Sequence, residues 1–125
     1  MVILDTCALI GFTGPSVTIS NQALFAIKES ACILSVSLAE IACKLKLNKL
    51  NVDYSAPELH DLLLQIPSIT IINIGVKEWF DAINLDWPHH RDPVDRLIVA
   101  FAQKNDIPIV TSDKSIKKFY KHVIW

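Results

Sequence analysis

The sequence contains no run of about 18 apolar residues, although 51% of its 125 residues are hydrophobic and its mean hydropathy is +0.35. This absence predicts that no helix spans a membrane, and it assigns the apolar surplus to a heavily buried sheet or to a surface kept for a partner. The segment Met1-Val2-Ile3-Leu4 lacks the basic start of a secretion signal, and Asp5 interrupts it. We therefore expect a cytoplasmic protein.

Cysteine pairs and an excess of either charge are also missing. Cys7, Cys32 and Cys43 are an odd number within apolar segments, which predicts buried, reduced thiols and neither disulfides nor metal ligands. Twelve basic and thirteen acidic side chains give a net charge of −1, so the chain lacks the overall basic character of a nucleic-acid binder. Any contact with a polyanion must come from local basic patches or from a bound cation.

Apolar runs alternate with helical patterns along the chain. The expected strands cover residues 2–4, 32–36, 69–74 and 108–111, with a final edge strand at 123–125. The expected helices cover residues 17–29, 37–45, 58–66, 76–83 and 92–104, with a last one after residue 113, whereas 7–15 is expected to be a loop. This alternation predicts a single α/β domain over residues 1–125, with a parallel β-sheet of four to five strands flanked by helices on both faces.

Polar residues mark where these helices start. Asp92 and Pro93 are an N-cap and a first helical residue, which places Asp95 at the third helical position. Ser37-Leu38-Ala39-Glu40 and Ser55-Ala56-Pro57-Glu58 both have the capping-box pattern, and Asp113 is expected to cap the last helix.

Four acidic residues follow strands or begin helices that the fold places at one edge. Asp5 ends the first strand, Glu40 and Asp95 lie about one turn into their helices, and Asp113 follows the fourth strand. Capping alone could account for the last three, but Asp5 directly follows apolar strand residues, where a carboxylate needs a partner or a metal. Because strand carboxyl ends and helix amino ends share one edge of a parallel sheet, we expect the four carboxylates to converge.

Converging carboxylates repel one another and favour a divalent cation. Two of them about 4 Å apart cost up to roughly 4 kcal/mol at an effective dielectric constant near 20. An all-oxygen site without clustered cysteine or histidine predicts Mg²⁺ or Mn²⁺ and not zinc. Such an acidic metal site is suited to phosphodiester hydrolysis.

The segments that carry these acids resemble a known family. They are Leu4-Asp5-Thr6, Ser37-Leu38-Ala39-Glu40-Ile41, Asp92-Pro93-Val94-Asp95-Arg96 and Thr111-Ser112-Asp113. In this order they look like the PIN-domain nucleases, and within them like the VapC-type toxins of bacterial type II toxin–antitoxin systems. Cys7, Val94 and Asn48 depart from residues that are frequent in that family, but no charged site residue is lost.

The resemblance implies an activity, a cofactor and partners. It implies a Mg²⁺- or Mn²⁺-dependent endoribonuclease that acts on RNA such as tRNA, with a small antitoxin over the active-site groove and a homodimer as the common assembly. The implied metal and catalytic residues are Asp5, Glu40, Asp95 and Asp113. Thr6, Asp92, Arg96 and Thr111 fall at supporting positions.

Other functions compete with this one. The main alternative is a catalytically inactive PIN-like module that only binds a protein, and a DNA-directed nuclease would use the same chemistry. A phospho-receiver domain is disfavoured because Asp5 is followed by Thr6 and the third strand ends in Ile74-Gly75. For an antitoxin, the candidate contacts are the helix at 58–66 and the residues near Leu45, Leu47 and Leu50.

Overall fold

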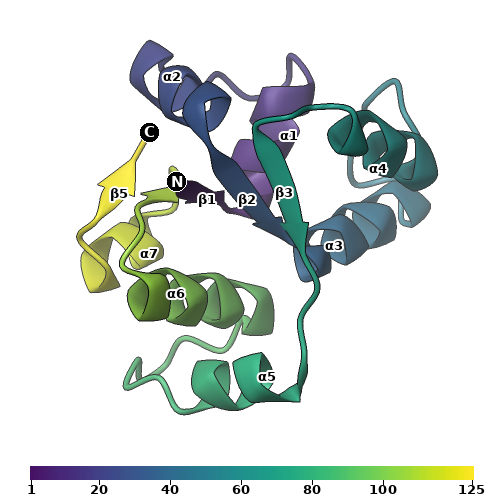
Figure 1. Cartoon of the computed structure of the whole chain (residues 1–125). Coiled ribbons are helices and arrows are strands. Elements are labelled where there is room, and N and C mark those ends of the chain that lie inside the picture. The colour runs from purple at the N-terminus through teal and green to yellow at the C-terminus, as the bar shows by residue number, and fades with distance from the viewer.

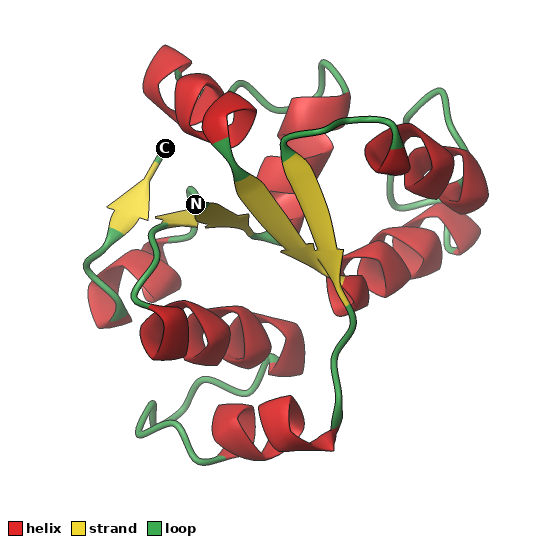
Figure 2. Cartoon of the chain, in the orientation of Figure 1, coloured by secondary structure: helices red, strands yellow, loops and turns green.

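Five parallel strands form the centre of the structure, a computed structural model that describes residues 1–125 (Figure 2). The strands are β1 (Val2–Leu4), β2 (Ala31–Leu34), β3 (Ile69–Ile72), β4 (Ile109–Val110) and β5 (Val123–Ile124). Their order in the sheet is β3-β2-β1-β4-β5, and Ile3 of β1 is in register with Cys32 on one side and Ile109 on the other. The chain therefore places β2 and β3 on one side of β1 and then crosses over to place β4 and β5 on the other side. In open parallel sheets such a switch point is where ligands bind, at the carboxyl ends of the strands.

Helices cover both faces of this sheet, as predicted (Figure 1). They are α1 (Thr6–Thr13), α2 (Asn21–Glu29), α3 (Ser35–Lys46), α4 (Ala56–Leu64), α5 (Val76–Ile83), α6 (Pro93–Asn105) and α7 (Lys114–Phe119). None of them combines the length and the apolar character needed to cross a bilayer.

Alternate strand residues point into two separate hydrophobic cores. Val2 and Leu4 of β1 pack in the core under α1 to α4, whereas Ile3 packs in the core under α5 to α7. β2 divides in the same way, with Ile33 in the first core and Cys32 in the second. This two-residue period in strands that are buried on both faces explains the high apolar content of the chain.

The predicted start of α6 is confirmed. Oδ1 of Asp92 accepts hydrogen bonds from the backbone N–H groups of Val94 and Asp95 at 2.9 and 3.0 Å. Pro93 is the first helical residue, and the inward face includes Leu97. α6 is thereby fixed with Asp95 in its first turn, next to the carboxyl edge of the sheet.

The prediction of a loop at residues 7–15 is wrong, because α1 begins directly after β1. Asp5 caps it, and its Oδ1 accepts a hydrogen bond from the N–H of Ala8 at 2.7 Å. The glycines that suggest a loop have another use, since a Cβ on Gly11 would lie 2.9 Å from Cγ1 of Ile19. Gly11 lets the chain after α1 pack closely against that helix.

The predicted capping box at Ser37–Glu40 is also wrong. α3 begins at Ser35, immediately after β2, and no side chain caps it. The hydroxyl of Ser37 is buried inside the first turn without a hydrogen-bond partner. Glu40 is therefore free of a capping role, in contrast to Glu58, whose predicted capping box with Ser55 is confirmed.

Three aromatic residues and the cysteines differ in their burial. Trp87 is buried, whereas Trp79 and Phe80 on α5 are 37% and 61% exposed. All three cysteines are unpaired, as predicted, but only Cys32 is buried and Cys43 is exposed. Cys43 lies on the outer face of α3, where the apolar pattern of the helix does not reach.

Candidate active site

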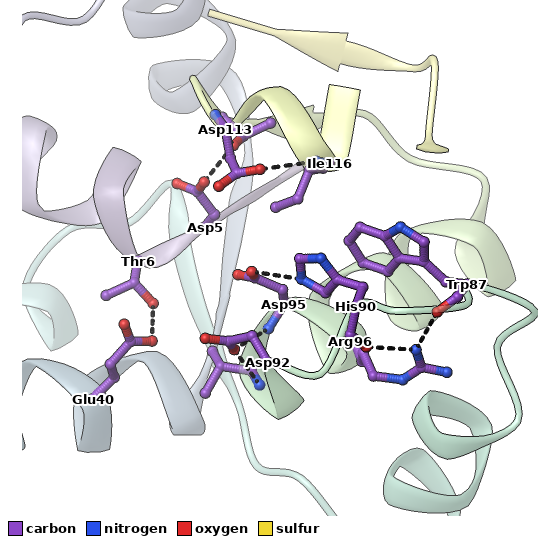
Figure 3. A network of polar contacts seen from close by, with 12 residues as sticks. Asp5, Thr6, Glu40, Trp87, His90, Asp92, Asp95, Arg96, Asp113 and Ile116 are labelled. Atoms are coloured by element: carbon purple, nitrogen blue, oxygen red, sulfur yellow. Dashed lines mark hydrogen bonds and ion pairs between the residues drawn. The ribbon is translucent and has the colours of Figure 1, made fainter. Parts of the chain in front are cut away.

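One pocket at the carboxyl edge of the sheet is lined by all four predicted acids. It has a volume of about 260 Å³, and it receives residues from the ends of β1 and β4 and from α3 and α6. Its lining residues are Asp5, Thr6, Cys7, Glu40, Lys44, Asp92, Asp95, Ser112 and Asp113. Acids separated by up to 108 positions in the chain thus lie together in space (Figure 3).

Asp5 is the most buried of these carboxylates, with 4% of its surface exposed. Its Oδ2 accepts a hydrogen bond from the hydroxyl of Thr111, which is itself buried, and its Oδ1 accepts the N–H of Ala8. Burial raises the pKa of Asp5, and Asp113 and Glu40 raise it further by repulsion, whereas the two hydrogen bonds lower it. Asp5 is therefore a carboxylate whose negative charge is poorly compensated by the protein.

Glu40 is held by two residues of the pocket. The hydroxyl of Thr6 donates to its Oε2 at 2.9 Å, and Nζ of Lys44 lies 3.3 Å from its Oε1. Since Lys44 is one turn further along α3, this ion pair is an i,i+4 pair on a partly exposed face. The pair keeps Glu40 directed into the pocket.

Asp95 has a histidine as its partner. Its Oδ2 lies 2.9 Å from Nε2 of His90, and the His90 ring stacks on Trp87 with centroids 3.6 Å apart (Figure 3). Burial and the nearby Asp92 raise the pKa of Asp95 to about 6, with a smaller contribution from Asp113. The carboxylate is therefore close to half-protonated near pH 6.

Asp113 and Asp92 each serve as a cap and line the pocket. Oδ1 of Asp113 accepts the N–H of Ile116 at 2.9 Å, and the N–H of Asp113 donates to the hydroxyl of Thr111 at 3.0 Å. Thr111 thus connects Asp113 to Asp5. Capping and a position in the pocket are compatible because the positive end of a helix dipole favours the ionised carboxylate.

Arg96, also expected near the site, is not among the residues that line the pocket. Its guanidinium donates hydrogen bonds to five backbone carbonyl oxygens between residues 82 and 90, at distances from 2.6 to 3.2 Å. Two of these carbonyls belong to Trp87 and His90. Arg96 therefore fixes the loop that presents His90 to Asp95.

Sequence reasoning predicted neither the contact of His90 with Asp95 nor the ion pair of Lys44 with Glu40. The signal for Lys44 was available, since Glu40 and Lys44 have the spacing of a helical ion pair. His90 lies in a loop without periodicity, so its contact with Asp95 depends on the loop path that Arg96 imposes.

The residues of the pocket have the donor chemistry of a Mg²⁺ or Mn²⁺ site. All the strong donors are carboxylate oxygens, and burial leaves Asp5 with uncompensated charge. As the side chains stand, no three histidine, cysteine, aspartate or glutamate residues are placed to hold one ion together. Magnesium is commonly bound through one or two carboxylates and retains several waters, so two of the acids in the pocket are enough to hold it.

A parallel α/β sheet with a pocket at its switch point has the layout of a ligand-binding α/β domain. Comparison with known proteins identifies the family. Residues 2–122 match the PIN domain family. The chain therefore belongs to the PIN-domain family. A search of curated proteins found no matching relative.

Solved structures with the same fold cover the whole chain. A toxin–antitoxin complex from Klebsiella pneumoniae is 20% identical, with a TM-score of 0.68 and 97% of that chain covered. VapBC2 from Rickettsia felis, bound to a DNA fragment from its promoter, is 18% identical, with a TM-score of 0.68 and 98% covered. FitAcB from Neisseria gonorrhoeae is 20% identical, with a TM-score of 0.60 and 97% covered. At these identities the likeness establishes the fold.

Proposed function

We propose that this chain is a metal-dependent endoribonuclease and the toxin of a type II toxin–antitoxin pair. The observation that carries the enzymatic part is the convergence of four carboxylates in one pocket of a PIN-domain chain. PIN domains are generally nucleases. Asp5, Asp92 and Asp113 also cap helices, but capping does not require their carboxylates to share one pocket. Four acids held together without a cation would reduce the stability of the fold.

Asp5, Glu40, Asp95 and Asp113 would hold Mg²⁺ or Mn²⁺. A divalent ion there would lower the pKa of a water molecule and offset the charge of the scissile phosphodiester. The other residues keep the carboxylates in place: Thr111 holds Asp5, and Thr6 holds Glu40. Lys44, at the same pocket, offers an ammonium group to a phosphate of the bound strand.

His90 has a more specific part in this proposal. Its ring is fixed by stacking on Trp87 and by the contact of Nε2 with Asp95. Through this contact it orients Asp95 toward the pocket. We regard it as a positioning residue.

The toxin role is supported by the solved structures of the same fold, which include a toxin–antitoxin complex and VapBC2. A small antitoxin protein is accordingly the proposed partner. Of the surfaces expected to contact it, Leu47 and two α4 residues, Leu62 and Leu64, are 44% to 65% exposed, whereas Leu45 and Leu50 pack partly against the core. A homodimer and a tRNA substrate stay predictions.

An RNA cleavage assay tests the proposal. The purified chain is incubated with total tRNA and with a single-stranded RNA, in Mn²⁺ and in EDTA. Cleavage in Mn²⁺ that EDTA abolishes is the expected result. Intact RNA in Mn²⁺ would favour the alternative, a catalytically inactive PIN-like module that only binds a protein. Cleavage of DNA and not of RNA would support metal-dependent phosphodiester hydrolysis but would contradict the proposed RNA substrate.

A further inference from the structure

Beside the acidic pocket lies a second hollow, of about 430 Å³, with the opposite chemistry. It is lined by seven residues of the 87–90 loop and of α7: Trp87, Pro88, His89, His90, Ser115, Lys118 and Phe119. None of them is acidic, whereas five carboxylates line the first pocket. We propose that this hollow binds one nucleotide of the RNA strand, next to the phosphodiester that lies at the acids. The inference rests on the proposed function and assigns a substrate site to it.

Position is the first argument, because the two cavities share a wall. His90 lines the hollow, and its Nε2 contacts Asp95, which lines the acidic pocket. On the other side, Ser112 and Asp113 belong to the pocket and Ser115 to the hollow. A strand with one phosphodiester at the acids therefore has a neighbouring nucleotide within reach of the hollow.

Charge is the second argument. The three ion pairs of the structure join Lys44 to Glu40, His90 to Asp95 and Lys104 to Asp81, so the Lys118 ammonium is not paired with any carboxylate. Lys118 and the hydroxyl of Ser115 are exposed hydrogen-bond donors at the hollow. An unpaired ammonium beside hydroxyl and imidazole donors selects an anionic ligand such as a phosphate group.

Aromatic rings are the third argument. Trp87 stacks on His90 and also on Phe119, with ring centroids 4.7 Å apart and planes 12° apart in the second pair. Trp87, His90 and Phe119 line the hollow together with the exposed His89. Proteins that bind single-stranded RNA combine such rings with a basic group, because each base offers a face for stacking. A volume above about 300 Å³ is in the range of small-ligand sites.

Preorganisation is the fourth argument. His89 has a φ of 69°, in the left-handed region that is uncommon for residues other than glycine. Arg96 holds the flanking carbonyls of Trp87 and His90 at 2.9 and 3.0 Å. The loop is thereby kept in a strained conformation with the His89 side chain at the rim, a feature that concentrates at binding sites.

Two exposed residues allow a test that leaves the acids untouched. Lys118→Gln removes the ammonium group, and His89→Asn removes the ring but tolerates the left-handed backbone. Lys28→Gln, an exposed lysine on α2, is the matched control for the loss of one charge. Binding of a labelled single-stranded RNA is measured with Ca²⁺ to offset the carboxylates, and a gel confirms that the RNA is intact. Polyphosphate serves as a second ligand that has charge but no bases.

We expect Lys118→Gln to weaken binding of both ligands about threefold to tenfold, and to reduce the salt dependence of RNA binding by about 0.7 in logarithmic slope. His89→Asn should weaken binding of RNA about fivefold and leave polyphosphate unchanged. RNA affinity equal to that of the Lys28→Gln control in both variants, or no binding by the unmodified chain, would overturn the nucleotide site. Failure of the unmodified chain to cleave RNA in Mn²⁺ is a separate result, which counts against the nuclease.

Discussion

The hydroxyl of Thr6 donates a hydrogen bond to Oε2 of Glu40 at 2.9 Å, across 34 positions of the chain. The residue that follows Asp5 thus orients the acid that α3 carries, and the end of β1 supplies both a carboxylate and the support for another. This contact is a direct consequence of the register in which β1 and β2 lie side by side.

Thr6→Val should separate the effect of the hydroxyl from the effect of the side-chain volume. The variant keeps the volume but loses the hydrogen bond, so Glu40 is free to turn toward Lys44 and solvent. We expect about 10-fold to 100-fold lower cleavage or metal affinity, the range typical of groups that orient metal ligands. Thr6→Ser, which retains the hydroxyl, is the control and should keep most of the activity. Equal rates for the Val and Ser variants would show that Thr6 does not support the site.

Asp5→Asn should abolish RNA cleavage without unfolding the chain. The amide is nearly isosteric with the carboxylate. Its oxygen can still accept the N–H of Ala8, and its NH₂ group can donate to the hydroxyl of Thr111. Burial already disfavours the charge of Asp5, so its removal should not lower the free energy of unfolding in metal-free buffer. Circular dichroism and thermal unfolding check the fold, and the Mn²⁺ cleavage assay checks activity. Full activity in a folded Asp5→Asn chain would reject Asp5 as a metal ligand.

Arg96→Lys should loosen the loop at residues 82–90 while leaving the acids in place. Lysine cannot reproduce the fork of hydrogen bonds to five carbonyl oxygens, so carbonyls near Trp87 lose their donors. We expect the free energy of unfolding to fall by about 2 to 4 kcal/mol, with faster proteolysis in the loop. Arg91→Lys, at an exposed residue of the same segment, should have the stability of the unmodified chain. A similar loss in both variants would show that the contacts of Arg96 with the carbonyl oxygens are not its cause.

Much of this architecture follows from the sequence, because strong local signals agree with the global pattern. The start of α6 at Asp92-Pro93 and the capping box at Ser55–Glu58 could be predicted, since cap and periodicity point the same way. α1 could not, because it is apolar on all sides and Gly11 has a packing role that only the position of Ile19 reveals.

The contacts of the candidate site were also predictable only where strong local signals agree with the topology. The gathering of the four acids could be predicted because parallel topology alone brings strand ends to one edge. The partner of Asp95 could not, because His90 reaches it through an irregular loop whose path depends on Arg96. The capping-box pattern at Ser37 misled for a related reason. α3 starts as soon as β2 ends, with Leu34 at the N-cap position, and Ser37 lies three residues further along.

Divalent metal should stabilise the fold. Burial raises the pKa of Asp5 and Asp95, and repulsion by neighbouring carboxylates raises it further in the folded chain. We expect Mg²⁺ or Mn²⁺ at millimolar concentration to raise the melting temperature, because an ion that binds only the folded state shifts the equilibrium toward it. Asp113→Asn, which removes one carboxylate from the pocket, should reduce the increase. The same increase with or without that carboxylate would place the metal elsewhere on the chain.

The stability of the metal-free chain should depend on pH through Asp95. Its pKa is about 6 in the folded chain against an ordinary value of 3.8, so the folded state binds the proton more tightly than the unfolded state. The resulting stabilisation is fully present below pH 3.8 and is lost as the pH rises through 6. Asp95→Asn has no such titration, so in EDTA the difference in melting temperature between this variant and the unmodified chain should shift in favour of the variant from pH 4 to pH 7. A difference that stays constant over this interval would show that the pKa of Asp95 is not raised in the folded chain. Addition of Mg²⁺ at pH 7 should reverse the shift, because the ion favours the ionised carboxylate that the variant lacks.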